Sequence, residues 1–81
     1  MPVTSAQLRM ARAALNWSLN DLAEASGVHR NTISNIEVGR YAGDPQTLKK
    51  LKRTLVKAGV DFIDENGGGP GVRLRQHQQD K

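Results

Sequence analysis

Apolar and polar residues follow one another with the period of an α-helix along the first 59 positions of this chain. In four stretches the apolar residues recur every three or four positions, which places them on one face of a helix. These stretches are residues 5–15, 19–26, 30–38 and the segment from Pro45 to Gly59. The pattern therefore predicts four amphipathic helices that pack their apolar faces together.

The predicted helix starts carry residue types that cap helix N-termini. The capping pairs are Thr4 with Gln7, Ser18 with Asp21, and Asp44 before Pro45. Their side-chain oxygens can accept hydrogen bonds from the free N–H groups of a first helical turn. The residues after three of the helices, Asn16, Gly39 and Gly59, are types that tolerate the left-handed conformation in which helices often end.

The period changes after Gly59. Val60 and Phe62 alternate with polar residues, and Val72 and Leu74 do so again after the glycine-rich segment 66–71. This alternation predicts two short β-strands around a long turn. The acidic residues before the turn lack the spacing of a calcium loop, and the glycines lack the Lys-Ser/Thr of a phosphate loop. The last residues, 76–81, are polar and are predicted to form a flexible tail.

Residues 18–40 have the spacing that a helix-turn-helix requires. Ala23 offers only a methyl group where two helices cross, and Gly27 suits a turn position with positive φ, which costs other residues roughly 1–2 kcal/mol. Val28, Ile33 and Ile36 then form an apolar ridge on the second helix. Its opposite face is polar, as a DNA-reading helix would be.

Composition limits the class of protein. The chain has 81 residues and no cysteine, which predicts one small domain without disulfides, of the kind found in a reducing cytoplasm. No apolar run approaches the roughly 20 residues of a membrane span, and the N-terminus lacks the apolar core of a signal peptide. We therefore expect a soluble cytoplasmic protein.

Positive charge is concentrated on the fourth predicted helix. The chain has 12 Lys and Arg against 8 Asp and Glu, a formal net charge of +4. Five of these cations fall between residues 44 and 60, where Asp44 is the only anion: Lys49, Lys50, Lys52, Arg53 and Lys57. Such a face is usually only solvated, but beside a helix-turn-helix it also suits a polyanion.

The segment SLNDLAEASGVHRNTISNIEVGR resembles the phage-repressor-like, or Xre-type, helix-turn-helix family, whose usual string is close to LTQEELAxxxGVSxxTISxIExGR. The resemblance extends over residues 8–55 and implies a mainly α, four-helix lambda-repressor-like domain, here with a short C-terminal β-hairpin or strand pair. It also implies a structural ion pair between Arg12 and Glu37. The chain departs from the family at Leu19, where a phosphate-gripping glutamine is common, and in having strands where a fifth helix is usual.

His29 is a further departure, because the family usually has Ser or Thr as the cap of the third helix. Two interpretations are open. The imidazole can accept the capping hydrogen bond, or it can face the DNA backbone when protonated. We favour the first.

The resemblance places the third helix in the major groove, with Arg30, Asn31 and Asn35 at base edges. Arginine can donate two hydrogen bonds to guanine, and asparagine can pair with adenine. Alternatively these side chains form only a polar surface. The residues predicted to contact the DNA backbone are Ser18, Thr32, Ser34, Arg40, Lys49 and Lys50. We expect no catalytic residues, metal site or cofactor, because the two histidines have no cysteine partners and no catalytic triad is apparent.

The sequence therefore predicts a DNA-binding domain over residues 1–59, a strand extension over 60–75 and the tail over 76–81. The expected function is a sequence-specific regulator of double-stranded DNA, most simply a homodimeric repressor. The alternative is a protein-interaction module of the same fold, such as an anti-activator or an antitoxin-like partner. The residues predicted to form the dimer contact are Val60, Phe62, Ile63, Val72 and Leu74. A competing possibility is that the ribbon folds back on the first and fourth helices of its own chain, which would leave a monomer that dimerises only on DNA.

Overall fold

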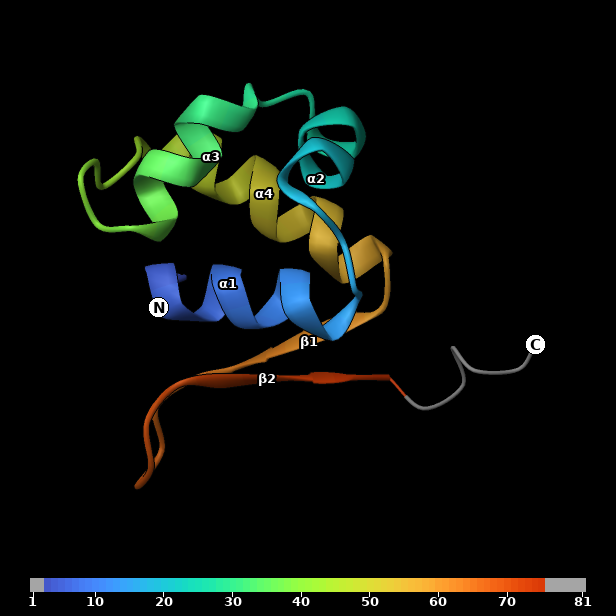
Figure 1. Ribbon diagram of the computed structural model, residues 1–81. Coiled ribbons are helices and arrows are strands. Elements are labelled where there is room, and N and C mark those ends of the chain that lie inside the picture. The colour runs from blue at the N-terminus through green and yellow to red at the C-terminus, as the bar shows by residue number, and fades with distance from the viewer. Residues whose placement is uncertain (1–2, 76–81) are drawn as a thin grey trace.

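The computed structural model describes residues 3–75, which form four helices followed by a two-stranded antiparallel sheet (Figure 1). The elements are α1 (Ser5–Ala14), α2 (Leu19–Ser26), α3 (Arg30–Glu37), α4 (Pro45–Lys57), β1 (Val60–Ile63) and β2 (Gly71–Leu74). The predicted mainly α fold with a C-terminal hairpin is confirmed. The predicted tail, residues 76–81, lies outside the described residues. Within the described part, no helix is long and apolar enough to cross a membrane.

The predicted caps fix the helix boundaries. At α1 and α2 the capping residue and the residue three positions later exchange hydrogen bonds, at 3.0 Å in both directions between Thr4 and Gln7. Asp44 accepts from the N–H of Thr47 at 2.8 Å, and this hydrogen bond is the main cause that lowers the pKa of Asp44. Asn16 has a positive φ of 59° and ends α1 as predicted. The structure ends α1 and α3 one residue earlier than predicted, because Leu15 and Val38 are their C-caps.

One hydrophobic core joins all six elements. Its fully buried large side chains are Leu8, Leu22, Ile33, Leu51, Leu55 and Val60. Trp17, Leu19 and Ala23 are half-buried and pack against this core. The methyl side chain of Ala23 therefore lies where α2 packs against its neighbours, as the spacing predicted.

The hairpin packs on α1 and α4 of its own chain. Its register pairs Val60 with Leu74 and Phe62 with Val72, so these four residues share one face. Val60 is fully buried, and Phe62 and Val72 pack against the core. The ribbon therefore folds back on its own chain, as the competing possibility described. Ile63 and Leu74 stay 37% and 38% exposed, so a dimer contact through them remains a prediction.

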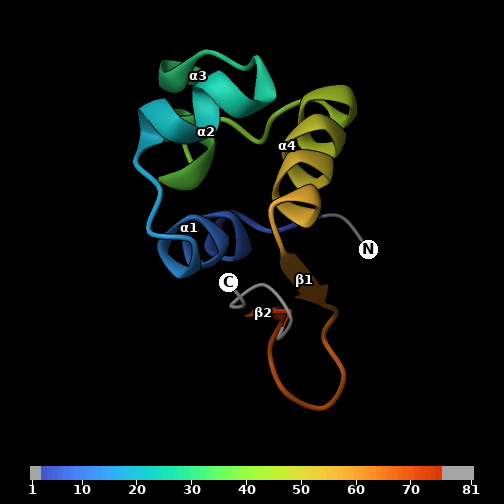
Figure 2. The ribbon, with the colours of Figure 1, turned by 90° about the vertical axis from the view of Figure 1, so that its right-hand side faces the viewer.

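A buried amide fastens the hairpin to α1. Nε2 of Gln7 donates to the carbonyl oxygens of Ile63, at 3.1 Å, and Gly71, at 3.0 Å, which face each other across the two strands. At the other end of the hairpin, Arg75 pairs with Asp61 at 3.0 Å and donates to the carbonyl of Val56. Figures 1 and 2 place the hairpin at the end of the molecule opposite α3.

Candidate nucleic-acid interface

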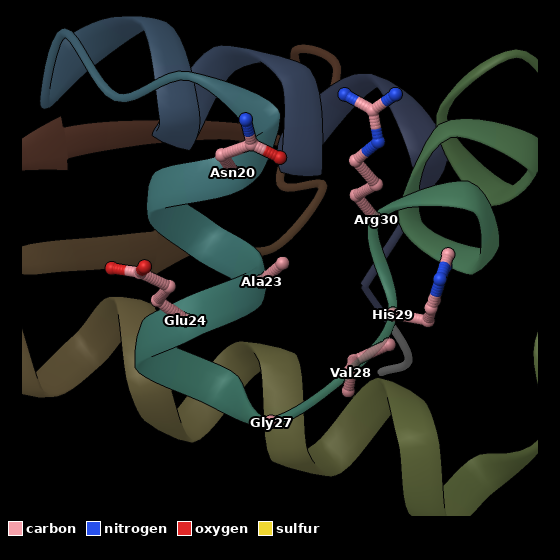
Figure 3. Close-up of a pocket in the computed structure, with 7 residues that line it drawn as sticks. All are labelled: Asn20, Ala23, Glu24, Gly27, Val28, His29 and Arg30. Atoms are coloured by element: carbon pink, nitrogen blue, oxygen red, sulfur yellow. The ribbon is translucent and has the colours of Figure 1, made fainter.

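The turn between α2 and α3 has the predicted geometry. Gly27 has φ of 79°, and its N–H donates to the carbonyl of Ala23 at 2.8 Å. A Cβ built at Gly27 would meet no atom within 4 Å, so the backbone conformation rather than space calls for glycine here. The turn and its two helices line an open concavity. Figure 3 shows the side chain of Arg30 at the edge of this concavity, beside α2.

His29 caps α3 in the way that we favoured from the sequence. Its Nδ1 accepts a hydrogen bond from the backbone N–H of Asn31 at 3.0 Å. A ring nitrogen that accepts this hydrogen bond carries no proton itself. The imidazole therefore takes the place of the Ser or Thr oxygen that usually caps this helix.

Helix α3 has one buried and one exposed face. Ile33 is fully buried and Ile36 is 3% exposed, which fixes the rotation of the helix against the core. Arg30 and Asn31 are exposed on the other side, and Asn35 is half-buried. The side chains of these three residues form no hydrogen bond with any residue between 3 and 75, so their donors and acceptors are available to a ligand.

The predicted backbone contacts are distributed over several elements. Ser18 is exposed at the start of α2, and its hydroxyl already accepts from the N–H of Asp21 at 3.0 Å. Thr32 and Ser34 are half-buried, whereas Arg40 is exposed just after α3. The exposed Lys50 lines a different concavity, between α2 and α4, with Trp17 among its neighbours. The structure thus separates Lys50 from Arg30.

Asn20 is a candidate site residue that sequence reasoning missed. It occupies the second position of α2 and lines the concavity at the turn together with Arg30 (Figure 3). Its neighbour Leu19 is half-buried against the core and does not extend into that concavity. The polar residue after the unusual leucine was the available signal, because a helical position one residue on lies on a different face.

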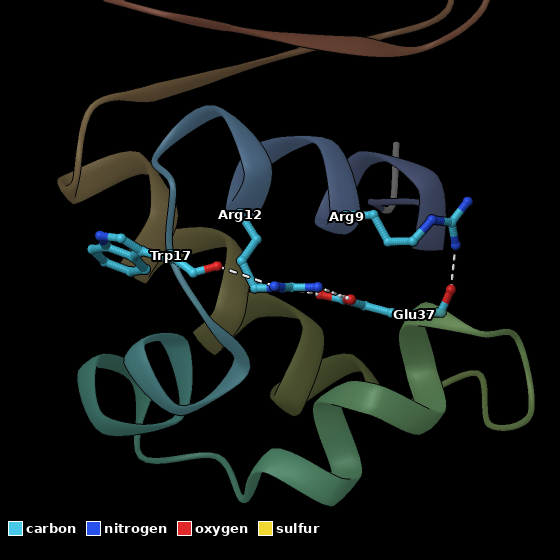
Figure 4. A network of polar contacts seen from close by, with 4 residues as sticks. All are labelled: Arg9, Arg12, Trp17 and Glu37. Atoms are coloured by element: carbon cyan, nitrogen blue, oxygen red, sulfur yellow. Dashed lines mark hydrogen bonds and ion pairs between the residues drawn. The ribbon is translucent and has the colours of Figure 1, made fainter.

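The ion pair implied by the resemblance is present. Nε and Nη2 of Arg12 donate to the two carboxylate oxygens of Glu37 at 2.9 and 2.8 Å (Figure 4). Nη1 of Arg12 donates to the carbonyl of Trp17 at 3.0 Å, and Arg9 donates to the carbonyl of Glu37. The hydrogen bond to Glu37 raises the pKa of Arg12, so the guanidinium stays charged. This network joins α1, the start of α2 and the end of α3, and so holds the helix-turn-helix on the rest of the domain.

Comparison with known families agrees with this geometry. A family model described as Helix-turn-helix matches residues 8–55, which span the four helices from within α1 to near the end of α4. The chain belongs to this Xre-like helix-turn-helix family of DNA-binding regulators. A search of the curated proteins found no match. No group of three or more potential metal ligands occurs within residues 3–75.

Proposed function

We propose that this chain is a sequence-specific regulator of double-stranded DNA that reads its site with α3 in the major groove. One observation carries the proposal. The exposed side chains of Arg30 and Asn31 stand at the N-terminus of α3 without hydrogen-bond partners among residues 3–75, beside a helix-turn-helix turn of the correct geometry. In helix-turn-helix proteins the N-terminal residues of the second helix contact base edges.

The chemistry of these residues suits direct readout. The guanidinium of Arg30 can donate two hydrogen bonds to O6 and N7 of guanine, and the amides of Asn31 and Asn35 can pair with N6 and N7 of adenine. Each such bidentate contact discriminates against a wrong base by about 1–3 kcal/mol. Asn20, which shares the concavity with Arg30, adds an amide that can meet a base edge or a phosphate.

The remaining contacts in this proposal go to phosphates and set the orientation of the domain. They come from Ser18, Thr32, Ser34, Arg40, Lys49 and Lys50. The cations among them supply the attraction to DNA that is independent of sequence, and the N-terminus of α2 adds a partial positive charge.

Repression by occlusion of a promoter is the simplest regulatory mode for such a domain. One helix-turn-helix reads only about half a turn of DNA, so a homodimer on a two-fold site, with half-sites about 34 Å apart, gives the required specificity. The hairpin lies at the end away from α3, which leaves α3 free to approach DNA (Figures 1 and 2).

A protein-interaction module is the second candidate, and one observation favours it. Val38 and Tyr41, directly after α3, are 61% and 45% exposed, and exposed apolar residues of this size suit a protein partner. The polar, cationic start of α3 favours DNA, because a docking helix would present apolar residues there.

Selection of bound fragments from random duplex DNA tests the two candidates. The proposal predicts enrichment of one sequence, with two-fold related half-sites about 10 base pairs apart from centre to centre. Selection that enriches no sequence, together with binding that is equal on all duplexes, would contradict sequence-specific regulation and favour the interaction module.

A further inference from the structure

Trp17 lies at the centre of a surface from which the DNA-reading proposal uses Lys50 alone. The residue directly precedes the cap of α2, and its half-buried indole stands at the outer edge of the molecule, beside α4 (Figure 4). Together with Ala25 of α2, it lines two neighbouring open concavities. Trp17 and Ala25 therefore form an apolar seam between two hollowed regions, and we call this region the Trp17 surface.

The two sides of the seam carry opposite charges. The first concavity is bordered by Lys50, Arg53 and Lys57 of α4, and the second by Asp21 and Glu24 of α2. The ion pairs within residues 3–75 use none of these five side chains. A basic strip and an acidic strip thus flank the seam, and no ion pair within residues 3–75 neutralises either strip.

Such a surface is complementary to itself. A two-fold rotation about an axis that runs along the seam places the basic strip of one molecule on the acidic strip of the other. The same rotation brings the two Trp17 side chains together at the centre, where protein interfaces concentrate aromatic residues inside a polar rim. We propose that the Trp17 surface, and not the hairpin contact predicted from the sequence, is the homodimer interface of this protein.

The position of the surface fits a dimer that reads DNA, and in this respect the inference rests on the proposed function. Figure 2 looks onto the face formed by α2 and the C-terminal end of α4, with α3 at one end and the hairpin at the other. Two molecules joined side by side through this face leave both α3 helices free at the same end.

Other occupants fit the Trp17 surface less well. An acidic peptide would pair with Lys50, Arg53 and Lys57, but Asp21 and Glu24 beside the same tryptophan would repel it. A second copy of the chain satisfies both strips at once. The charge pattern therefore selects the homodimer.

A charge-reversal experiment tests this interface without DNA. Glu24→Lys reverses the acidic strip and Lys57→Glu reverses the basic strip, and both sites are exposed, so folding should be retained. Asp21 is avoided because its carboxylate accepts the N–H of Ser18 at the start of α2. Each substitution occurs twice in a two-fold dimer, so each variant alone should dimerise at least about tenfold more weakly in sedimentation velocity. Glu65→Lys, in the exposed turn of the hairpin, is the matched control and should dimerise like the wild type.

Mixing the two variants distinguishes the second copy from every other occupant. In the mixed dimer the lysine introduced by Glu24→Lys meets the glutamate introduced by Lys57→Glu in the other molecule. The unchanged Lys57 of the first molecule meets the unchanged Glu24 of the second, so an equimolar mixture should recover wild-type association. A wild-type chain that stays monomeric at millimolar concentration would overturn the proposal, as would variants that dimerise normally or a mixture that does not recover. Binding of the wild type to a selected duplex is measured separately, so DNA reading and the interface can fail independently.

Discussion

Arg12 of α1 holds both carboxylate oxygens of Glu37, the last residue of α3, at 2.9 and 2.8 Å. Glu37 is only 4% exposed, so its charge is stabilised by the guanidinium rather than by water. Two parallel hydrogen bonds fix the relative orientation of the two side chains as well as the distance between them. The pair therefore sets the position of α3, and with it the position of Arg30 and Asn31.

Removal of one partner should destabilise the fold. Glu37→Ala leaves Arg12 facing a buried space without its counter-charge, which costs about 3–5 kcal/mol in buried pairs, and the 23% exposure of the Arg12 side chain favours the lower end. The free energy of unfolding from urea titration measures this loss. The double variant Arg12→Met/Glu37→Leu should recover part of it, because no charge is then left unpaired. A loss below about 1 kcal/mol in Glu37→Ala would instead describe an exposed pair.

Gln7 should control the attachment of the hairpin. Gln7→Leu keeps the volume but leaves the carbonyl groups of Ile63 and Gly71 without their donor, at an expected cost of about 1–3 kcal/mol. It also removes the side-chain oxygen that accepts from the N–H of Thr4 in the cap of α1. Hydrogen exchange should also become faster in β1 and β2, while α3 keeps its protection. The comparison variant is Thr4→Ala, which removes the cap of α1 but leaves the two carbonyl contacts. Unchanged exchange in both strands of the Gln7 variant would contradict the role of this amide.

The helices could be predicted from the sequence because their signals are local. The caps at Thr4, Ser18 and Asp44 act over three residues, and each of them is present in the structure. The second role of Gln7 could not be found in this way. Its partners lie 56 and 64 residues further along the chain, and its capping role already accounts for a glutamine at that position.

Asp44 should make stability depend on acidic pH. The hydrogen bond from the N–H of Thr47 lowers the pKa of Asp44, so the folded state favours the carboxylate. The stabilisation is complete above the pKa of the unfolded chain, about 3.9, and is lost as the pH falls through the lower pKa of the folded state. Asp44→Asn keeps a good cap without this titration. The advantage of the wild type in melting temperature at pH 7 should therefore shrink below about pH 4, and an advantage that stays constant would contradict the effect.

Lys49 should report on contact with the DNA backbone. If it neutralises one phosphate, Lys49→Ala weakens binding to all duplexes alike and lowers the slope of log K against log salt by up to about one. Lys52 offers a matched control, because its ammonium lies 5.9 Å from the ring centre of Phe62 in the hairpin. Lys52→Ala should leave the slope unchanged. The same slope in wild type and Lys49→Ala would mean that the exposed lysine is only solvated.

Only part of the candidate site could be predicted from the sequence. The polar face of α3 follows from its apolar period, since Ile33 and Ile36 determine which residues face outward. Asn20 was missed because its place beside Arg30 depends on how α2 crosses the start of α3. The sequence did not decide what covers the apolar face of the hairpin, the core of its own chain or a second copy. The alternation of Val60 and Phe62 shows that one side is buried but not which surface covers it.

The most direct test of the account compares two arginine variants on two duplexes, one selected for binding and one scrambled. Arg30→Ala should lose about 1–3 kcal/mol of binding free energy on the selected duplex and less on the scrambled one, because a base contact is lost. Arg40→Ala should weaken both by the same factor, since a phosphate contact carries no sequence information. Equal losses on both duplexes for Arg30→Ala would contradict the central claim that α3 reads the sequence.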